Sequence, residues 1–279
     1  MLRRFGRGRV ALAALALGLA IWAIAIEPAR LVLRDETVEV SDWRGGPLNV
    51  ALIADLHVGA PHFGVARMRE VAALVAAQRP DLVLMLGDYT TTGMAGGTEV
   101  DPNEWTPFFG TIPARLGVFA VLGNHDWWYD SSGTQAALEA GGVTVLENAA
   151  RPIDTGAGQF WLVGIGDTFT GHDRVDTAFA TVPNGATVLA MSHGPDVTDK
   201  LERRADLVVA GHTHGGQIYI PFVTEGLLNL RWRRGLYHPA GVPLYVTSGV
   251  GTSILPLRFG VPPEVVMLHV QPMKFAAAR

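Results

Sequence analysis

The chain has 279 residues, a formal net charge of −4 and a mean hydropathy of +0.23. Its 48% hydrophobic and 17% charged residues exclude a disordered protein, and a pI near 6.1 argues against a nucleic-acid binder that relies on a basic surface. The absence of cysteine excludes disulfide scaffolds, cysteine-ligated zinc and thiol nucleophiles. The mean hydropathy is high for a soluble protein, so a strongly apolar segment must raise the average.

That segment is Val10–Ile26, an uncharged run of 17 residues near the start of the chain. A helix that crosses a bilayer needs about 20 residues, within a range of roughly 17–25. Four basic residues and no acidic residue precede the run: Arg3, Arg4, Arg7 and Arg9. Because positive flanks stay in the cytoplasm, we expect a single pass through the inner membrane, with the following domain on the external, periplasmic face.

Two other interpretations of this run stay open. A cleaved secretion signal also begins with positive charge and an apolar stretch, but the run is long for that purpose and Ala25-Ile26-Glu27 is a poor cleavage site. A buried core helix is the other, since the run has no polar face. We favour a retained anchor, and we divide the chain into a basic anchor segment at 1–34 and a globular domain at 35–279.

The charge of the chain divides unevenly between these parts. Residues 1–34 hold six arginines and one glutamate, so the remainder carries 16 basic and 25 acidic residues, a net charge of −9. An acidic domain repels anionic ligands unless a local field reverses the effect. Bound divalent cations would do so.

Alternating apolar runs and helical patterns follow from Leu48 onward. The expected helices are Val65–Gln78, a helix that begins at the capping sequence Asp101–Glu104, and Ser131–Ala140. The expected strands are Thr37–Val40, Leu48–Ala54, Leu82–Leu86, Val118–Leu122, Val143–Leu146, Phe160–Ile165, Thr187–Met191, Leu207–Ala210, Gln217–Ile220, Leu244–Thr247 and Val265–Val270. This order predicts one layered α/β domain built on central sheets.

Polar side chains follow five of these strands directly. They are Asp55 and His57 in A-D-L-H, Asp88 in L-G-D, Asn124, His125 and Asp126 in L-G-N-H-D, His193 in M-S-H-G-P, and His212 and His214 in A-G-H-T-H-G-G-Q. In α/β sheets, ligand sites collect beyond the carboxyl ends of the strands. We therefore expect these side chains to meet at one edge.

The residue types suit two metal ions. Alternate residues of an extended segment point the same way, so D-x-H and H-x-H would each place two ligands on one side. Carboxylate, imidazole and amide oxygen together favour Mn²⁺, Fe or Zn²⁺ over Ca²⁺. A carboxylate such as Asp88 can bridge two ions through its two oxygens.

The ordered motifs D-x-H, G-D, G-N-H-D, S-H and G-H-T-H resemble the calcineurin-like metallophosphoesterase superfamily from about Leu48 to Val270. G-H-T-H-G-G-Q-I and S-G-V-G-T-S-I-L-P-L-R-F-G-V-P-P-E are similar to its membrane-anchored bacterial branch of YkuE-type and YaeI-type phosphodiesterases. The resemblance implies a four-layer αββα sandwich and an enzyme that hydrolyses phosphate esters.

The resemblance also implies a role for each motif residue. The first of two divalent ions would be held by Asp55, His57 and His214, and the second by Asn124, His193 and His212, with Asp88 bridging. A hydroxide between the ions would attack phosphorus in line. His125 would protonate the leaving oxygen or stabilise phosphoryl charge, with Asp126 orienting its ring.

The substrate expected from the resemblance is a phosphodiester or pyrophosphate of the membrane or cell envelope. Enzymes of similar sequence cleave UDP-2,3-diacylglucosamine in lipid A biosynthesis. That substrate is cytoplasmic, whereas the arginine asymmetry favours an external domain, and the two inferences conflict. A phosphomonoesterase acting on soluble or polymer-borne phosphates is the alternative, and a non-catalytic metal-binding module is a weaker one.

Several residues outside the motifs allow two interpretations. Asp167 follows a strand and either supports the site or has a structural role. The histidines outside the motifs, expected to be structural, are His62, His172, His238 and His269. The aromatic run Trp127-Trp128-Tyr129 either walls the site or packs its loop. The basic run 231–234 is a solvated loop or binds phosphate or an anionic membrane, and the apolar segment 221–230 beside it could approach lipid.

Overall fold

The computed structural model describes residues 2–224 and 231–273, which form two six-stranded sheets and an isolated N-terminal helix. The first sheet has the order β1-β12-β2-β3-β4-β5, with strands β1 (Val32–Val40), β12 (Glu264–Pro272), β2 (Leu48–Ile53), β3 (Leu82–Met85), β4 (Val118–Ala120) and β5 (Thr144–Val145). The second has the order β10-β11-β9-β8-β7-β6, with strands β10 (Gly235–Tyr237), β11 (Leu244–Val246), β9 (Leu207–Ala210), β8 (Val188–Ser192), β7 (Gln159–Ile165) and β6 (Ala149–Asp154).

The strands that precede the motifs run parallel within each sheet. In the first sheet β2, β3, β4 and β5 are parallel neighbours, and in the second β7, β8, β9 and β11 are. The edge strand β6 pairs antiparallel with β7, and the edge strand β10 pairs antiparallel with β11. In the first sheet, β12 pairs antiparallel with β2. The parallel register places the carboxyl ends of the motif strands at a common edge of each sheet.

The two sheets pack face to face with helices outside, as expected for the four-layer αββα sandwich. Side chains alternate along each strand: Val50 and Leu52 of β2 pack between the sheets with Leu189 and Val209 of the second sheet. Ile53 lies instead in the outer layer, under the helices of the first sheet. The strands thus bury both faces, which explains their unbroken apolar sequence.

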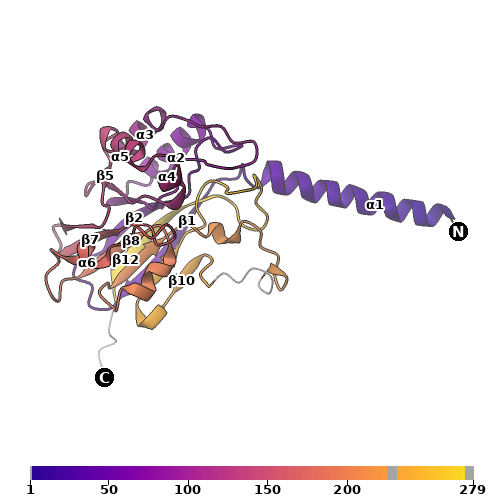
Figure 1. Ribbon diagram of the computed structural model, residues 1–279. Helices are drawn as coiled ribbons and strands as arrows, with labels where there is room; N and C mark the ends of the chain where they lie inside the picture. The colour runs from indigo at the N-terminus through magenta and orange to yellow at the C-terminus, as the bar shows by residue number, and fades with distance from the viewer. Residues whose placement is uncertain (1, 225–230, 274–279) are drawn as a thin grey trace, which may run out of the picture.

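Helices cover both outer faces (Figure 1). The first sheet is covered by α2 (Val65–Ala77), α3 (Thr106–Gly110) and α5 (Ser131–Ala140), and the second by α6 (Val175–Phe179) and the 3₁₀ segment η3 (Pro195–Lys200). Short helical segments in the loops include α4 (Asn124–Tyr129), η2 (Pro102–Glu104), η4 (His214–Gly216) and η5 (Pro239–Gly241).

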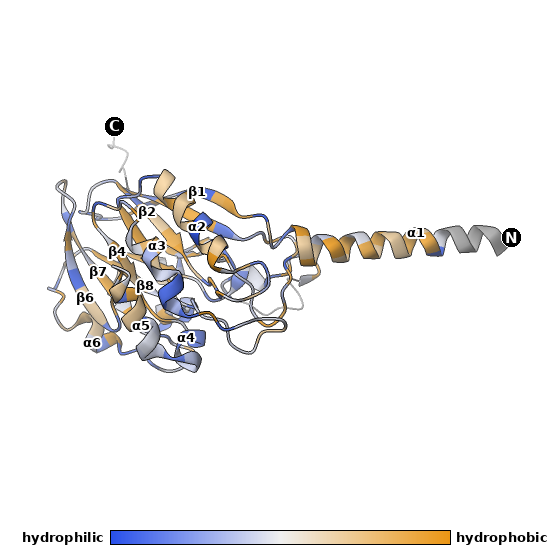
Figure 2. Ribbon diagram, turned by 90° about the horizontal axis from the view of Figure 1, so that it is seen from above, coloured by the Kyte–Doolittle hydropathy of each residue, from blue (hydrophilic) through white to orange (hydrophobic). Residues whose placement is uncertain are grey.

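The N-terminal helix α1 (Leu2–Ile21) continues into a π-helical turn, η1 (Trp22–Ile26), and stands away from the body in both views (Figures 1 and 2). Residues Gly8–Ile26 have a mean hydropathy of 2.2, and none of that window is buried. The alternative of a buried core helix is therefore wrong. The segment is long and apolar enough to cross a bilayer or to act as a signal sequence.

Two sequence predictions need correction in the fold. Gln217–Ile220 is not a strand: Gln217 has φ +55°, and only Ile218 makes a single bridge, to Phe259. β1 is longer than the Thr37–Val40 strand that we expected, because it begins at Val32 and pairs along its length with β12. This strand crosses the boundary that we placed between residues 34 and 35.

Candidate metal centre

Every motif residue lies directly beyond the carboxyl end of its strand, and the two sheets bring these ends together. Asp55 and His57 follow β2, Asp88 follows β3, Asn124 and His125 follow β4, His193 follows β8, and His212 and His214 follow β9. Two groups of possible metal ligands result, each with its ligand atoms within 4.8 Å of one another.

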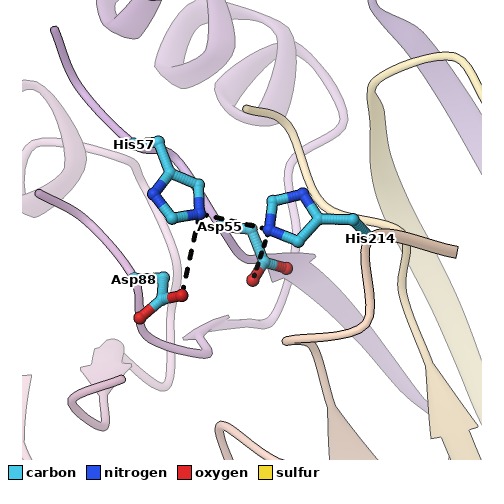
Figure 3. Close-up of side chains that lie close together, drawn as sticks. All are labelled: Asp55, His57, Asp88 and His214. Carbon is cyan, nitrogen blue, oxygen red and sulfur yellow. Dashed lines mark hydrogen bonds and ion pairs between the residues drawn. The ribbon is translucent and has the colours of Figure 1, made fainter. Parts of the chain in front are cut away.

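The first group consists of Asp55, His57, Asp88 and His214, all of them buried (Figure 3). The Nε2 atoms of His57 and His214 lie 3.1 Å apart. His57 Nε2 is 3.6 Å from Asp88 Oδ2, and His214 Nε2 is 3.6 Å from Asp55 Oδ1. Figure 3 shows both imidazoles and both carboxylates pointing inward.

The second group consists of Asp88, His193 and His212, with the amide of Asn124 beside them. Nε2 of His193 lies 3.2 Å from Asp88 Oδ2, 3.1 Å from Asn124 Oδ1 and 3.0 Å from His212 Nδ1. Nδ1 of His193 lies 2.8 Å from the carbonyl oxygen of Leu86. A proton held on Nδ1 by that carbonyl leaves Nε2 free to act as a ligand.

Asp88 belongs to both groups, but through one oxygen. Its Oδ2 faces both His57 and His193, while its Oδ1 accepts the backbone N–H of His125 at 2.8 Å. The arrangement differs from the expected bridge through two oxygens, because the N–H bond already engages Oδ1. A single shared oxygen, anchored by the other, remains compatible with two neighbouring cations.

The spacing of the donor atoms fits divalent metal ions. An ion at roughly 2.0–2.2 Å from nitrogen and oxygen ligands places neighbouring ligand atoms about 2.8–3.6 Å apart. The six separations given above are 3.0–3.6 Å, and all ligand atoms of a group lie within 4.8 Å of one another. Burial lowers the pKa of His57 to about 3 and that of His212 to about 4, so both imidazoles are neutral and free to bind a cation at pH 7.

The carboxylates and His193 are strongly perturbed by their burial together. Burial raises the pKa of Asp55 to about 7. Burial would do the same to Asp88, but the neighbouring His193 and His57 hold the pKa of that carboxyl well below its usual value. Burial also opposes charge on His193, yet Asp88 raises its pKa to about 10. The buried carboxylates need a cationic partner, and divalent ions would supply it in place of the proton on His193.

The ligands converge through turns rather than through extended strands. Asp55, His57, Asp88, His212 and His214 all have positive φ, between +42° and +70°. The expectation that D-x-H and H-x-H lie on one side of an extended segment is therefore wrong. Five non-glycine residues in the left-handed region are a concentration of backbone strain, and such strain gathers at functional sites.

His125 sits beside the two groups without joining either. Its Nδ1 lies 2.7 Å from Thr92 Oγ1, its Nε2 lies 3.5 Å from Ser253 Oγ, and its ring packs edge-on against His57 with centroids 4.6 Å apart. It is the second residue of helix α4, whose N-terminal end is formed by the G-N-H-D motif. His125 lines the pocket, with its Nε2 facing Ser253 of the pocket wall.

Contrary to our expectation, Asp126 does not orient the ring of His125 by direct contact. Its carboxylate accepts backbone N–H groups of Asp88, Tyr89, Thr90 and Gly123 at 2.8–3.1 Å. Asp126 therefore fixes the loop after β3, and through that loop the position of Asp88. The orienting contact to His125 comes from a threonine that the motif search did not single out.

An open pocket of about 740 Å³ leads to the two groups. Its polar side carries Asp88, Asn124, His125, His212 and His214, and its other residues are Thr92, Gly93, Trp128, Phe169, Thr213, Gly216, Gln217, Ser253 and Ile254. The aromatic run thus divides: Trp128 walls the pocket, while Trp127 stacks on His172 with ring centroids 3.5 Å apart. The pocket can accept an apolar or ring-bearing group next to the metal ligands.

Sequence reasoning missed the residues that the last loop contributes. Ser253 and Ile254 line the pocket, and Arg258 is fully buried behind it, donating to the carbonyls of Gly251 and Val261. Nη2 of Arg258 also lies 3.5 Å from His214 Nδ1. Both Ser253 and Arg258 lie within the sequence S-G-V-G-T-S-I-L-P-L-R, but no motif spacing identifies either residue as functional.

The remaining candidates lie beside the site or away from it. Asp167 is buried; its Oδ2 accepts the N–H and hydroxyl of Thr170, while its Oδ1 has no partner among the described residues. His62 contacts the end of the N-terminal helix and not the site. In the basic run, Arg231 pairs with Asp199. Of the apolar segment 221–230, residues 225–230 lie outside the described residues.

Comparisons with known proteins agree on one family. The family model of calcineurin-like phosphoesterases matches residues 48–216. The phosphodiesterase YaeI of Escherichia coli is 33% identical over 80% of this chain and 82% of its own length. The metallophosphoesterase YkuE of Bacillus subtilis is 24% identical, covering 90% and 89%. A Danio rerio transmembrane protein with a metallophosphoesterase domain is 27% identical over 86% of this chain and 57% of its own length.

Proposed function

The chain belongs to the calcineurin-like phosphoesterase family and is a hydrolase of phosphate esters, and on this premise we propose that it is a phosphodiesterase or pyrophosphatase that uses two divalent metal ions. The observation that supports this proposal most is the pair of ligand groups that share Asp88 at the floor of one pocket. The similarity to the phosphodiesterase YaeI favours a diester over a monoester.

We assign Asp55, His57 and His214 to the first ion and Asn124, His193 and His212 to the second, with Asp88 shared. Manganese suits this mixed oxygen and nitrogen set, as do iron and zinc. When bound, the two ions would supply an activated water and neutralise charge on the phosphoryl oxygens. The chain's own part is to hold these ligands rigidly, through the positive-φ turns and the N–H bonds to Asp126.

His125 is the proposed proton donor to the leaving oxygen. Thr92 Oγ1 at 2.7 Å fixes the ring through Nδ1, so that Nε2 remains for the substrate. Burial lowers the pKa of His125, and an incoming phosphate anion opposes that shift. The imidazole of His125 would thus become protonated when the substrate binds. Its contribution should be greatest for poor leaving groups, which need protonation most.

The membrane helix and the apolar pocket wall support an envelope substrate. Trp128 and Phe169 are largely exposed at the pocket mouth, where they could hold a base or an acyl chain. A UDP-2,3-diacylglucosamine-like lipid of lipid A biosynthesis has both. We place the globular domain, whose first strand begins at Val32, on the periplasmic face of the inner membrane from the arginine-rich start of the chain. A cytoplasmic substrate would require the opposite orientation.

The test compares two soluble esters with the full chain loaded with Mn²⁺ in detergent. We expect turnover of bis-p-nitrophenyl phosphate to exceed that of p-nitrophenyl phosphate, and His125→Ala to lower diester turnover while leaving the metal content unchanged. A preference for the monoester would favour the phosphomonoesterase alternative. No hydrolysis of either ester with Mn²⁺, Fe²⁺ or Zn²⁺ would leave a binding module and contradict the proposal.

A further inference from the structure

Five large apolar side chains are exposed on two loops beside the pocket. Their exposed fractions are Ile220 40%, Phe222 91%, Val223 49%, Ile254 73% and Leu255 50%. We name these five residues the apolar rim. In a domain with a net charge of −9, apolar exposure of this size on adjoining loops marks an interaction surface.

The two loops form one unit, because several hydrogen bonds join them. The amide of Gln217 pairs with the backbone of Ser253 in both directions, at 2.9 and 2.6 Å. Tyr219 N donates to Phe259 O, and Phe259 N donates to Gln217 O. The two loops are therefore joined, and the rim is continuous with the pocket wall, to which Gln217, Ser253 and Ile254 belong.

One of these two loops, through Arg258, is attached to the carboxyl end of the N-terminal helix, beside contacts from His62 and Arg67. The backbone N–H of Arg258 donates to the carbonyl of Ala23 at 2.9 Å. His62 Nε2 lies 2.9 Å from the carbonyl of Ile24, and Arg67 Nη2 donates to that of Ala29 at 2.6 Å. The π-helical turn is thus docked on the domain, and the helix leaves from the side that carries these loops (Figure 1).

These contacts set the depth of the rim relative to the apolar helix. The apolar stretch runs from Gly8 to Ile26, so Ala23 lies inside it, within one turn of its end. Trp22, a residue type typical of the membrane interface, donates its indole N–H to buried Glu27 at 2.7 Å. A loop bonded to Ala23 lies at the level where headgroups meet acyl chains.

We propose that the apolar rim rests in the interface of the bilayer that the helix crosses. The pocket then opens at the headgroup layer, and a phosphate ester anchored in that layer reaches the metal ligands without leaving the membrane. The second statement rests on the proposed function, whereas the first rests only on the rim and the docked helix. Interfacial apolar side chains of this kind penetrate roughly 5–10 Å into the headgroup and acyl boundary.

The natural absence of cysteine permits a direct measurement of depth. Single substitutions Phe222→Cys and Ile254→Cys in the full chain would carry a nitroxide label in nanodiscs of phosphatidylethanolamine and phosphatidylglycerol. Gln159→Cys is the matched control, since Gln159 is exposed at the amino end of β7, opposite the site. We expect labels at 222 and 254 to collide with membrane-dissolved oxygen, and the label at 159 to collide with a water-soluble nickel chelate.

Two outcomes would overturn the proposal. Labels at 222 and 254 that meet the nickel chelate as readily as the label at 159 would place the rim in water. Labels shielded from both reagents would show that a second copy of the chain or another protein covers the rim. Neither outcome depends on catalysis, so depth can be decided even if no ester is hydrolysed.

A second experiment links the rim to substrate supply. Phe222 does not line the pocket, so Phe222→Asp should leave turnover of soluble bis-p-nitrophenyl phosphate unchanged. Turnover of a phosphodiester lipid held in vesicles should fall about tenfold, while Phe222→Leu should retain it. Equal turnover of the vesicle substrate by all three proteins would contradict access from the headgroup layer. If the unmodified chain does not hydrolyse soluble bis-p-nitrophenyl phosphate, that result would instead count against the proposed function.

Discussion

Gly123 lies against the shared carboxylate, and Gly123→Ala tests how closely Asp88 must be held. A Cβ at 123 would lie 2.3 Å from Oδ1 and 2.4 Å from the backbone nitrogen of Asp88. Non-bonded heavy atoms prefer separations of about 3.5 Å, so Asp88 must move by about 1 Å. The backbone of Gly123 is extended, with φ −104° and ψ 177°, so alanine meets no conformational strain of its own.

Such a movement would disturb both ligand groups at once. About 1 Å is half a metal–ligand distance, and the same Asp88 faces His57 and His193. We expect metal affinity about 10- to 100-fold weaker, as for other residues that position metal ligands. In the metal-free chain, overpacking should lower the free energy of unfolding by about 1–3 kcal/mol.

The assay is metal content after equilibrium dialysis against Mn²⁺, with urea unfolding in detergent and chelator as the measure of stability. Gly64→Ala is the control: Gly64 also begins a helix in extended backbone, and nothing lies within 4 Å of its added Cβ. Its effect should stay within about 1 kcal/mol, the cost of replacing an N-cap glycine by alanine, and should not include metal binding. A Gly123→Ala chain with unchanged metal affinity would refute the tight placement of the carboxylate.

Three further outcomes are expected. Burial raises the pKa of Glu147 to about 7, so the folded chain keeps a proton that the unfolded chain loses, and stability falls as pH rises from about 4 to 7. Glu147→Gln removes this titration but keeps the acceptor for the Leu122 N–H. In urea unfolding, the free energy of unfolding of the variant minus that of the original chain should therefore grow by up to about 3 kcal/mol between about pH 5 and 8. A difference that stays constant over this range would contradict the prediction. Thr92→Val removes the hydroxyl at His125 Nδ1 and should lower kcat about tenfold without loss of metal. An unchanged kcat would show that Thr92 does not position His125. Chelation should lower the unfolding midpoint by about 5–10 °C, and an unchanged midpoint would argue against a metal bound in the folded chain.

Periodicity predicted most of the fold where local sequence and packing agree. Ser131–Ala140 is a helix with the bounds expected from its pattern, and Leu82–Leu86 and Leu207–Ala210 coincide with buried parallel strands to within a residue. These segments have one apolar stripe or two buried faces, so the tertiary environment strengthens the local signal. The order of the elements predicted a layered α/β domain, and the family resemblance implied its four layers.

The failures occurred where partners distant in sequence decide the conformation. The edge strand β6 carries Pro152, which lowers the strand signal, yet it pairs with β7 because an edge strand tolerates a missing donor. Gln217–Ile220 alternates like a strand but is held as a loop by Phe259 and Ser253. No pattern within either segment reveals these contacts.

Residue identities at the candidate site were easier to predict than their geometry. The motifs placed Asp55 and His57 correctly after β2, but not their positive-φ turns. They also did not reveal that Asp126 bonds backbone amides while Thr92 meets His125. Such contacts arise when loops from several strands meet, and single motifs carry no information on them.

Metal stoichiometry tests the central claim most directly. Elemental analysis of the full chain, equilibrated with Mn²⁺ in detergent, should find two ions per chain, and Asp88→Ala should lose both, because one carboxylate oxygen faces both ligand groups. A single ion in the unmodified chain, or two ions retained by Asp88→Ala, would contradict the shared two-metal site.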